Sequence, residues 1–233
     1  MGLPGSTAKD GIYYKLSEEN KMLKKFFKIF VPAVYSGLCI GIGGMVYLNC
    51  ENKVVGAFMF CIGLLTILLF GFNLYTGKVG YICQNKPAYI GQVAIVWLGN
   101  FAGTAIMAGL CKLTRNADKL TEACKSMVEV KLNDSLLSLF VLAVFCGMLM
   151  FIAVDTYKHH YEKKDTMVTV VAILGVVVFI LAGFEHCIAD MFYFTLAGAF
   201  PKAFPALIMM TLGNALGGNL IPLGQNIMKK LNN

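Results

Sequence analysis

Charged residues are scarce in this chain, and two familiar frameworks for binding a metal are missing. Only 14% of the 233 residues are charged, against roughly 25% in ordinary soluble domains. The eight cysteines include no CxxC pair, which argues against a disulfide framework and against a zinc cage. No HExxH sequence occurs, which argues against that class of zinc enzyme. The sequence predicts no metal site, no cofactor and no enzymatic activity.

Long apolar runs take up most of the chain instead. Hydrophobic residues make up 58% of it, and about 20 apolar residues in a row suffice for a helix to cross a bilayer. The first run is too long for the core of a cleaved signal peptide, so the N-terminus is expected to be retained. The sequence predicts an all-α membrane protein with six transmembrane helices, over about residues 26–49, 54–72, 88–111, 135–157, 166–183 and 204–228.

The net charge of +7 is interpreted as a topology signal, not as a nucleic-acid surface. Thirteen Lys and Arg residues fall in the N-terminal tail, the second and fourth loops and the C-terminal tail, and seven in the other loops. Cytoplasmic loops are enriched in these residues, so both termini are predicted to be cytoplasmic, in a plasma or inner membrane. Residues 1–25 are expected to form a cytoplasmic segment with a short helix, 26–228 one transmembrane domain, and 229–233 a cytoplasmic tail. The fourth loop contains Lys158, His159, His160, Lys163 and Lys164.

Three motifs occur twice in the same order. FVPAVYSG matches FVLAVFCG at five of eight positions, GFNLYTG is matched by GFEHCIA, and GNFAG by GNALG. Each half, about 26–111 and 135–228, would hold three passes, so the second half enters the membrane from the opposite side. Such inverted repeats are frequent in channels and transporters, where the pathway runs near the repeat interface. The matched stretches are 30–37 with 140–147, 71–77 with 183–189, and 99–103 with 213–217.

The two GF motifs end an apolar half-segment with polar residues and precede a short second segment. Broken helices at membrane depth are tolerated only where they are buried in protein or line a cavity. Helices two and five are therefore predicted to be broken, with Asn73, Thr76, Glu185 and His186 beside a pore.

GFNLYTGK, GFEHCIADMF, GNFAG and GNALGG together resemble the formate/nitrite transporter family, over about residues 26–225. The resemblance implies an aquaporin-like six-helix protomer with its own pore, assembled as a homopentamer in the lipid bilayer. It implies a channel that passes small monovalent anions or their neutral acids.

The resemblance also implies residue roles. Thr76 matches the threonine of the loop that interrupts the second helix, and His186 the central histidine of the fifth. Lys131 matches a lysine that draws anions inward from the outer side, and Asn214 a pore-side asparagine. The implied apolar constrictions are Phe60, Leu64, Leu74, Tyr75, Met150 and Phe179.

Two departures from the family pattern bear on the substrate. Asn73 stands where the family usually has an acid, and Gly147 where many members have asparagine. This pattern resembles the hydrosulfide-channel branch, so hydrosulfide is the first expected substrate. A formate or nitrite channel with proton-coupled transport of the neutral acid is the alternative.

The mechanism stays open between two forms. The anion passes as such, held by His186, Thr76 and the positive ends of half-helices, or it receives a proton at the centre and crosses as the neutral acid. Glu185 is expected to pair with Lys131 or cap a half-helix, because buried charges are usually paired; Asp190 is expected to be structural. Two competing classes are a membrane metal enzyme, with His186 and Asp190 at i and i+4, and a scaffold without transport.

Overall fold

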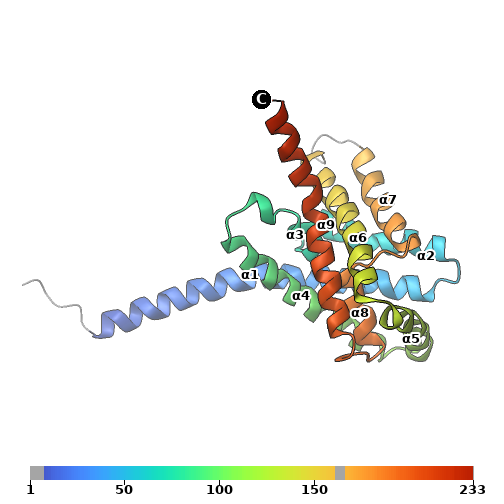
Figure 1. Cartoon of the computed structure of the whole chain (residues 1–233). Helices are drawn as coiled ribbons and strands as arrows, with labels where there is room; N and C mark the ends of the chain where they lie inside the picture. Colours follow the sequence, from blue (N-terminus) through green and yellow to red (C-terminus); the bar gives the residue numbers. More distant parts are fainter. Residues whose placement is uncertain (1–7, 161–165, 233) are drawn as a thin grey trace, which may run out of the picture.

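All regular secondary structure is helical in the part of the chain that the computed structural model describes, residues 8–160 and 166–232. Lys163 and Lys164, predicted to lie in the fourth loop, fall outside these ranges. Figure 1 shows the N-terminal part of α1 extending away from the body that the other helices form. The elements are α1 (Ala8–Asn49), α2 (Lys53–Phe70), α3 (Tyr75–Val79), the 3-10 turn η1 (Ile82–Gln84), α4 (Ala88–Cys111), α5 (Ala117–Asn133), α6 (Leu136–His160), α7 (Met167–Leu181), α8 (Cys187–Leu196) and α9 (Phe204–Leu231).

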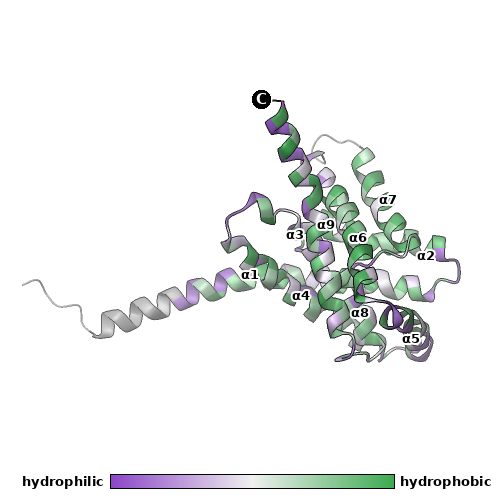
Figure 2. Cartoon of the chain, in the orientation of Figure 1, coloured by the Kyte–Doolittle hydropathy of each residue, from purple (hydrophilic) through white to green (hydrophobic). Residues whose placement is uncertain are grey.

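Five of the described helices are long and apolar enough to cross a bilayer: α1 from Glu19 onward, α2, α4, α6 and α9. The apolar helices α7 and α8 are shorter, with 15 and 10 residues. Figure 2 shows hydrophobic residues over these helices and polar residues along α5 and at the C-terminal end of α9. This is the predicted all-α membrane fold, and the count of six spans stays a prediction.

Two segments contain more helix than the sequence predicts. α1 runs unbroken through residue 25. The helix therefore shows no boundary between a cytoplasmic segment and the membrane domain at this residue, and that boundary stays a prediction. The third loop, about residues 112–134, contains α5. Leu120, Cys124 and Val128 on α5 are buried, because a four-residue spacing puts them on one face of a helix. α5 packs through this face against α1 and α8.

Glycines bring α1 against α4 and α6 against α9. A Cβ added at Gly103 would lie 2.0 Å from the Val34 carbonyl oxygen, and one added at Gly217 would lie 1.9 Å from that of Val144. The two contacts occupy equivalent places in the two halves. Helices approach this closely only where no side chain stands between their backbones. The GNFAG and GNALG motifs thus set the spacing of the two tightest helix pairs.

We expect Gly217→Ala to lower the free energy of unfolding by about 1–3 kcal/mol, the usual cost of overpacking. The added methyl group would push α9 away from α6. Gly224→Ala on the same helix is the matched control, because nothing lies within 4 Å of its Cβ position. Both variants gain the same helix propensity. Thermal unfolding in detergent compares them, and equal midpoints would contradict the close contact.

The chain leaves the helical conformation at each GF motif. α2 ends before Gly71 (φ 67°), and the stretch after α7 contains Gly183 (φ 68°). Glycine adopts this left-handed conformation without the steric cost of a Cβ atom. The amide of Phe72 then donates to a carbonyl five residues back at 3.0 Å, and that of Phe184 does the same at 2.9 Å, as in a Schellman motif. Each motif therefore stops its helix by the same local geometry.

Asn100 of α4 joins the first interruption to its surroundings. Its Oδ1 accepts a hydrogen bond from the Tyr75 amide at 2.8 Å, and its Nδ2 donates to the carbonyl oxygens of Asn73 at 2.9 Å and Ala33 at 2.8 Å. The side chain is fully buried. Asn100 thus supplies partners for backbone groups that a continuous helix would have paired.

Asn214 of α9 does the same for the second interruption. Its Oδ1 accepts from the Cys187 amide at 2.9 Å, and its Nδ2 donates to the carbonyl oxygens of Glu185 and Ala143, both at 2.8 Å. Every one of these partners is the repeat equivalent of a partner of Asn100. The inverted repeat therefore extends from the sequence motifs to individual hydrogen bonds.

Candidate functional site

Two cavities, one at each interruption, are related by the repeat, and a third of about 70 Å³ lies beside Asn73. The cavity beside α5 and α8, here the His186 cavity, has a volume of about 270 Å³. The cavity beside α3 and the end of α6, here the Lys78 cavity, has a volume of about 660 Å³. Their linings contain residues 112 positions apart: Ile67 and Phe179, Gly71 and Gly183, Phe72 and Phe184, Leu74 and His186, Lys78 and Asp190, Tyr81 and Tyr193.

Thr76 and His186 meet between the two interruptions. Thr76 Oγ1 lies 2.9 Å from His186 Nε2, although the residues are 110 positions apart. Both side chains are buried. His186 lines its cavity, whereas Thr76 lines neither of the two cavities, so the contact connects the cavity lining to the buried interior. The two residues that the family resemblance places on the pathway are thus brought together by the fold.

The hydrogen bonds of His186 indicate which ring nitrogen carries the proton and which group accepts it. Its Nδ1 accepts from the Ala189 amide at 3.1 Å, so the side chain caps the N-terminus of α8. The proton of a neutral imidazole then lies on Nε2, which can donate to Thr76 Oγ1. The Thr76 hydroxyl is left with its own proton to donate elsewhere. The imidazole ring also stacks on the ring of Phe179, with 5.4 Å between the ring centroids, and this contact fixes the orientation of the imidazole.

Lys131 joins two carboxylates at the wall of the His186 cavity. Its ammonium group forms an ion pair with Glu185 and a second one with Asp190 at 3.0 Å. Burial by itself lowers the pKa of the Lys131 ammonium, but Asp190 and Glu185 more than offset this and raise it. The structure pairs Glu185 with Lys131, as the sequence predicts. Asp190, expected to be structural, lies in the same cluster.

The six predicted constriction residues are all buried. Phe60 and Phe179 line the His186 cavity with ring centroids 6.1 Å apart, and Leu74 lines the Lys78 cavity. Tyr75 lines neither cavity, and its hydroxyl donates to the Thr211 carbonyl at 3.0 Å.

Helix periodicity relates two of these residues, Leu64 and Met150, to residues that line the cavities. Leu64 of α2 lies one turn from Phe60, which lines the His186 cavity, and one turn from Leu68, which lines the Lys78 cavity. Met150 of α6 precedes Val154 of the Lys78 cavity by one turn. Residues four apart share a helix face, so Leu64 lies on the face of α2 that reaches both cavities, and Met150 on the face of α6 that reaches the Lys78 cavity. Their role as constrictions stays a prediction.

Asn73 and Asn214 line neither of these two cavities. Asn73 is half-buried, and its Nδ2 donates to the Ile29 carbonyl at 3.0 Å. Asn214 uses both protons of its amide on backbone carbonyls, as described above. Their place on a pathway stays a prediction, and their observed contacts are with the backbone.

The glycine at position 147 has a packing reason. A Cβ there would lie 2.4 Å from the Asn214 carbonyl oxygen, so an asparagine side chain at this position would collide with α9. The equivalent Gly37 faces the Asn100 carbonyl oxygen at 2.2 Å. The tight packing of α6 on α9 therefore explains why position 147 is a glycine and not an asparagine.

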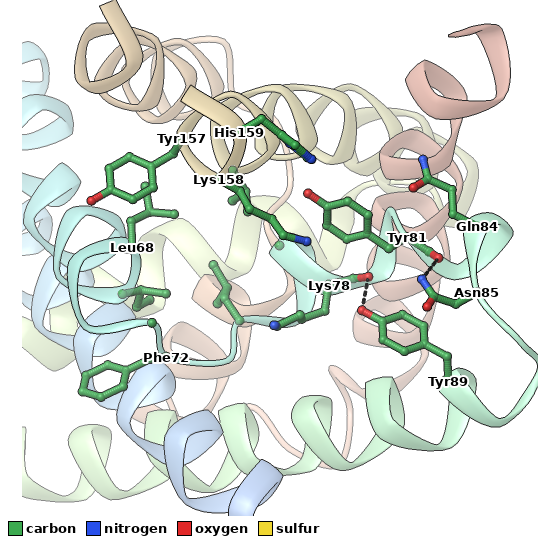
Figure 3. A pocket seen from close by; sticks show the side chains of 15 residues that line it. Leu68, Phe72, Lys78, Tyr81, Gln84, Asn85, Tyr89, Tyr157, Lys158 and His159 are labelled. Atoms are coloured by element: carbon green, nitrogen blue, oxygen red, sulfur yellow. Dashed lines mark hydrogen bonds between the residues drawn. The ribbon is translucent and has the colours of Figure 1, made fainter. Parts of the chain in front are cut away.

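The Lys78 cavity contains a different set of polar groups (Figure 3). Lys78 comes from α3, and the hydroxyl of Tyr89 donates to its carbonyl at 3.1 Å. Lys158 from α6 places its ammonium 4.4 Å from the centroid of the Tyr81 ring, a cation–π contact. The sequence pattern gave no functional role to Lys78 or Asn100. Their repeat equivalents, Asp190 and Asn214, were the available signal.

No group of three or more His, Cys, Asp and Glu side chains is placed to hold a metal ion within residues 8–160 and 166–232. His186 and Asp190, which a metal enzyme would use together, have other partners. The imidazole nitrogens contact Ala189 and Thr76, and Asp190 is paired with Lys131.

Comparison with known proteins connects this geometry to a family. The model of the formate/nitrite transporter family matches residues 14–226. The chain belongs to the formate/nitrite transporter family. Among curated relatives, the formate channel FocA of Escherichia coli K12 is 25% identical, with 89% of each chain covered. The formate-nitrite transporter of Plasmodium malariae is 26% identical, over 83% of this chain and 72% of the relative.

Solved structures show the same fold. A pentameric formate channel with formate bound matches with a TM-score of 0.73 at 23% identity, over 89% of this chain and 98% of that chain. A second channel, an FNT family ion channel, has a TM-score of 0.73 at 21% identity, over 89% and 90%. This member of the formate/nitrite transporter family is therefore a multi-pass membrane protein of the channel class, and its relatives are channels and transporters, not enzymes.

Proposed function

We propose that the protein is a channel for small monovalent anions, with a pathway through each protomer from the His186 cavity to the Lys78 cavity. The observation that carries the proposal is the Thr76–His186 contact between two cavities that the inverted repeat relates. The apolar layer formed by Phe60, Leu64 and Leu74 separates the cavities. Hydrogen-bond donors at its centre would offset part of the cost of dehydrating an anion there.

The two central residues form a neutral donor in this mechanism. With Nδ1 occupied by the Ala189 amide, His186 Nε2–H donates to Thr76, and the Thr76 hydroxyl donates to the anion. Protonation of Nδ1 would break the bond to Ala189. This arrangement supports passage held by hydrogen bonds, and transfer of a proton to form the neutral acid is the alternative.

Hydrosulfide is the first candidate substrate, with formate and nitrite as alternatives. Asn73 donates to a backbone carbonyl, which a carboxylate could not do, and Gly147 leaves no side chain at its position. The two departures thus remove polar groups that other members of the family carry. The relatives named formate channels support the alternative.

The assembly and topology follow from two further arguments. The solved pentameric formate channel supports a homopentamer of this chain in the lipid bilayer. The distribution of Lys and Arg supports cytoplasmic termini in a plasma or inner membrane. The Lys78 cavity, beside Lys158 near the end of α6, would then open to the cytoplasm.

Flux into liposomes containing the purified protein tests the proposal. We expect hydrosulfide, formate or nitrite to enter far faster than chloride, and His186→Ala to lower this flux by about tenfold or more, in the range of other lost donors. His186→Asn is the matched variant, because asparagine is a good helix cap and its amide can donate toward Thr76. It is expected to keep much of the flux.

Two outcomes would overturn the proposal. Protein that is folded and pentameric but moves none of the three anions would exclude the channel, and a scaffold without transport would then be the better reading. If His186→Ala transports the anion at the wild-type rate, His186 has no role in the pathway.

A further inference from the structure

The two equivalent cavities carry opposite balances of charge. The His186 cavity is lined by Lys131 together with Glu185 and Asp190. The Lys78 cavity is lined by Lys78, Lys158 and His159, and by no carboxylate among the described residues. At the equivalent repeat position, Asp190 in one cavity is replaced by Lys78 in the other. Among the described residues, the cationic excess therefore belongs to the Lys78 cavity and not to its repeat equivalent.

Asp155, a described carboxylate next to the Lys78 cavity, is engaged by two residues of the cavity lining. Asp155 Oδ1 accepts from the Tyr81 hydroxyl at 2.8 Å and lies 3.2 Å from His159 Nδ1. Within residues 8–160 and 166–232, the Lys78 ammonium has no hydrogen bond or ion pair. The Lys158 ammonium contacts an aromatic ring. Both cations therefore keep donors available for a ligand in the cavity.

Two ammonium groups that line one cavity repel each other, and an anion between them removes that repulsion. A monovalent anion balances one of the two charges, whereas a divalent anion balances both. Transfer of an ion into an apolar layer costs free energy that rises steeply with its charge. A dianion would therefore bind in the Lys78 cavity but would not cross the layer formed by Phe60, Leu64 and Leu74.

We propose that the Lys78 cavity binds a small divalent oxyanion, of the class of hydrogen phosphate and sulfate, between Lys78 and Lys158. The bound dianion occupies the mouth of the pathway and slows the passage of monovalent anions. The binding site stands on the charge and geometry of the cavity, and its effect on flux rests on the proposed channel function.

Binding of inorganic phosphate to the detergent-solubilised protein, followed by calorimetry at pH 8 and constant ionic strength, tests the site directly. Saturable binding to the wild type is expected, with the affinity weakened about tenfold or more in Lys78→Met and in Lys158→Met. Lys86→Met is the matched control, since Lys86 is an exposed lysine of the nearby loop that lines neither cavity. Lys78→Arg keeps the charge and is expected to keep binding.

Flux measurements are the second test of this proposal. Phosphate and sulfate on the Lys78 side are expected to inhibit uptake of the permeant anion, and chloride at equal ionic strength is not. Absence of saturable phosphate binding, or equal affinity in the wild type and both methionine variants, would overturn the site. Binding without any anion flux would leave the site standing and overturn the channel function, so the two failures are distinguishable.

Discussion

Lys131→Met is expected to abolish most anion flux and to lower the free energy of unfolding by about 3–5 kcal/mol, the usual cost of removing one partner of a buried ion pair. The side chain of Lys131 is 14% exposed, and its ammonium contacts Glu185 and Asp190. Without it, two carboxylates would remain beside His186. Their negative charge would repel anions that enter the His186 cavity. Liposome flux and thermal unfolding in detergent measure the two effects.

Controls separate charge from packing in this experiment. Lys125→Met removes an exposed lysine from the same helix and is expected to change neither stability nor flux appreciably. Adding Glu185→Gln and Asp190→Asn to Lys131→Met removes the uncompensated acids and is expected to recover most of the stability. If the triple variant is no more stable than Lys131→Met, unpaired charge is not the cause of the loss.

Asn214→Leu is expected to lower the free energy of unfolding by about 3–9 kcal/mol, because three buried backbone groups would lose their partner at about 1–3 kcal/mol each. These groups are the Cys187 amide and the carbonyls of Glu185 and Ala143. Flux is also expected to fall, since Glu185 and Cys187 flank His186. Thermal unfolding in detergent gives the first quantity.

The equivalent residue Asn100 allows the same experiment at the first interruption. Asn100→Leu is expected to destabilise the protein by a similar amount, because its three backbone partners are equivalent. Asn226→Leu, at an exposed position of α9, is the control for the added apolar surface. A loss in Asn226→Leu as large as in Asn214→Leu would show that the bonds to the interruption are not responsible.

Features encoded locally were predictable from the sequence. Apolar runs gave the membrane helices, because the thickness of the bilayer fixes their length. Gly71 and Gly183 marked the interruptions, because only glycine takes a positive φ at low cost. The helical character of residues 112–134 was missed. The four-residue spacing of Leu120, Cys124 and Val128 was the available signal, and only the packing of α5 on α8 shows that this face is buried.

The sequence by itself predicted the repeat and the two interruptions, since short motifs carry both, and the family resemblance of those motifs singled out His186 as the central histidine. Only the tertiary structure decided that Thr76 contacts His186, that Lys131 holds two acids, and that Asn100 and Asn214 bind the interruptions. These contacts join helices far apart in sequence, and helix packing selects which polar groups meet. The opposite charge of the two cavities comes from different residues at equivalent positions, such as Lys78 and Asp190, and the fold decided that these residues line the cavities.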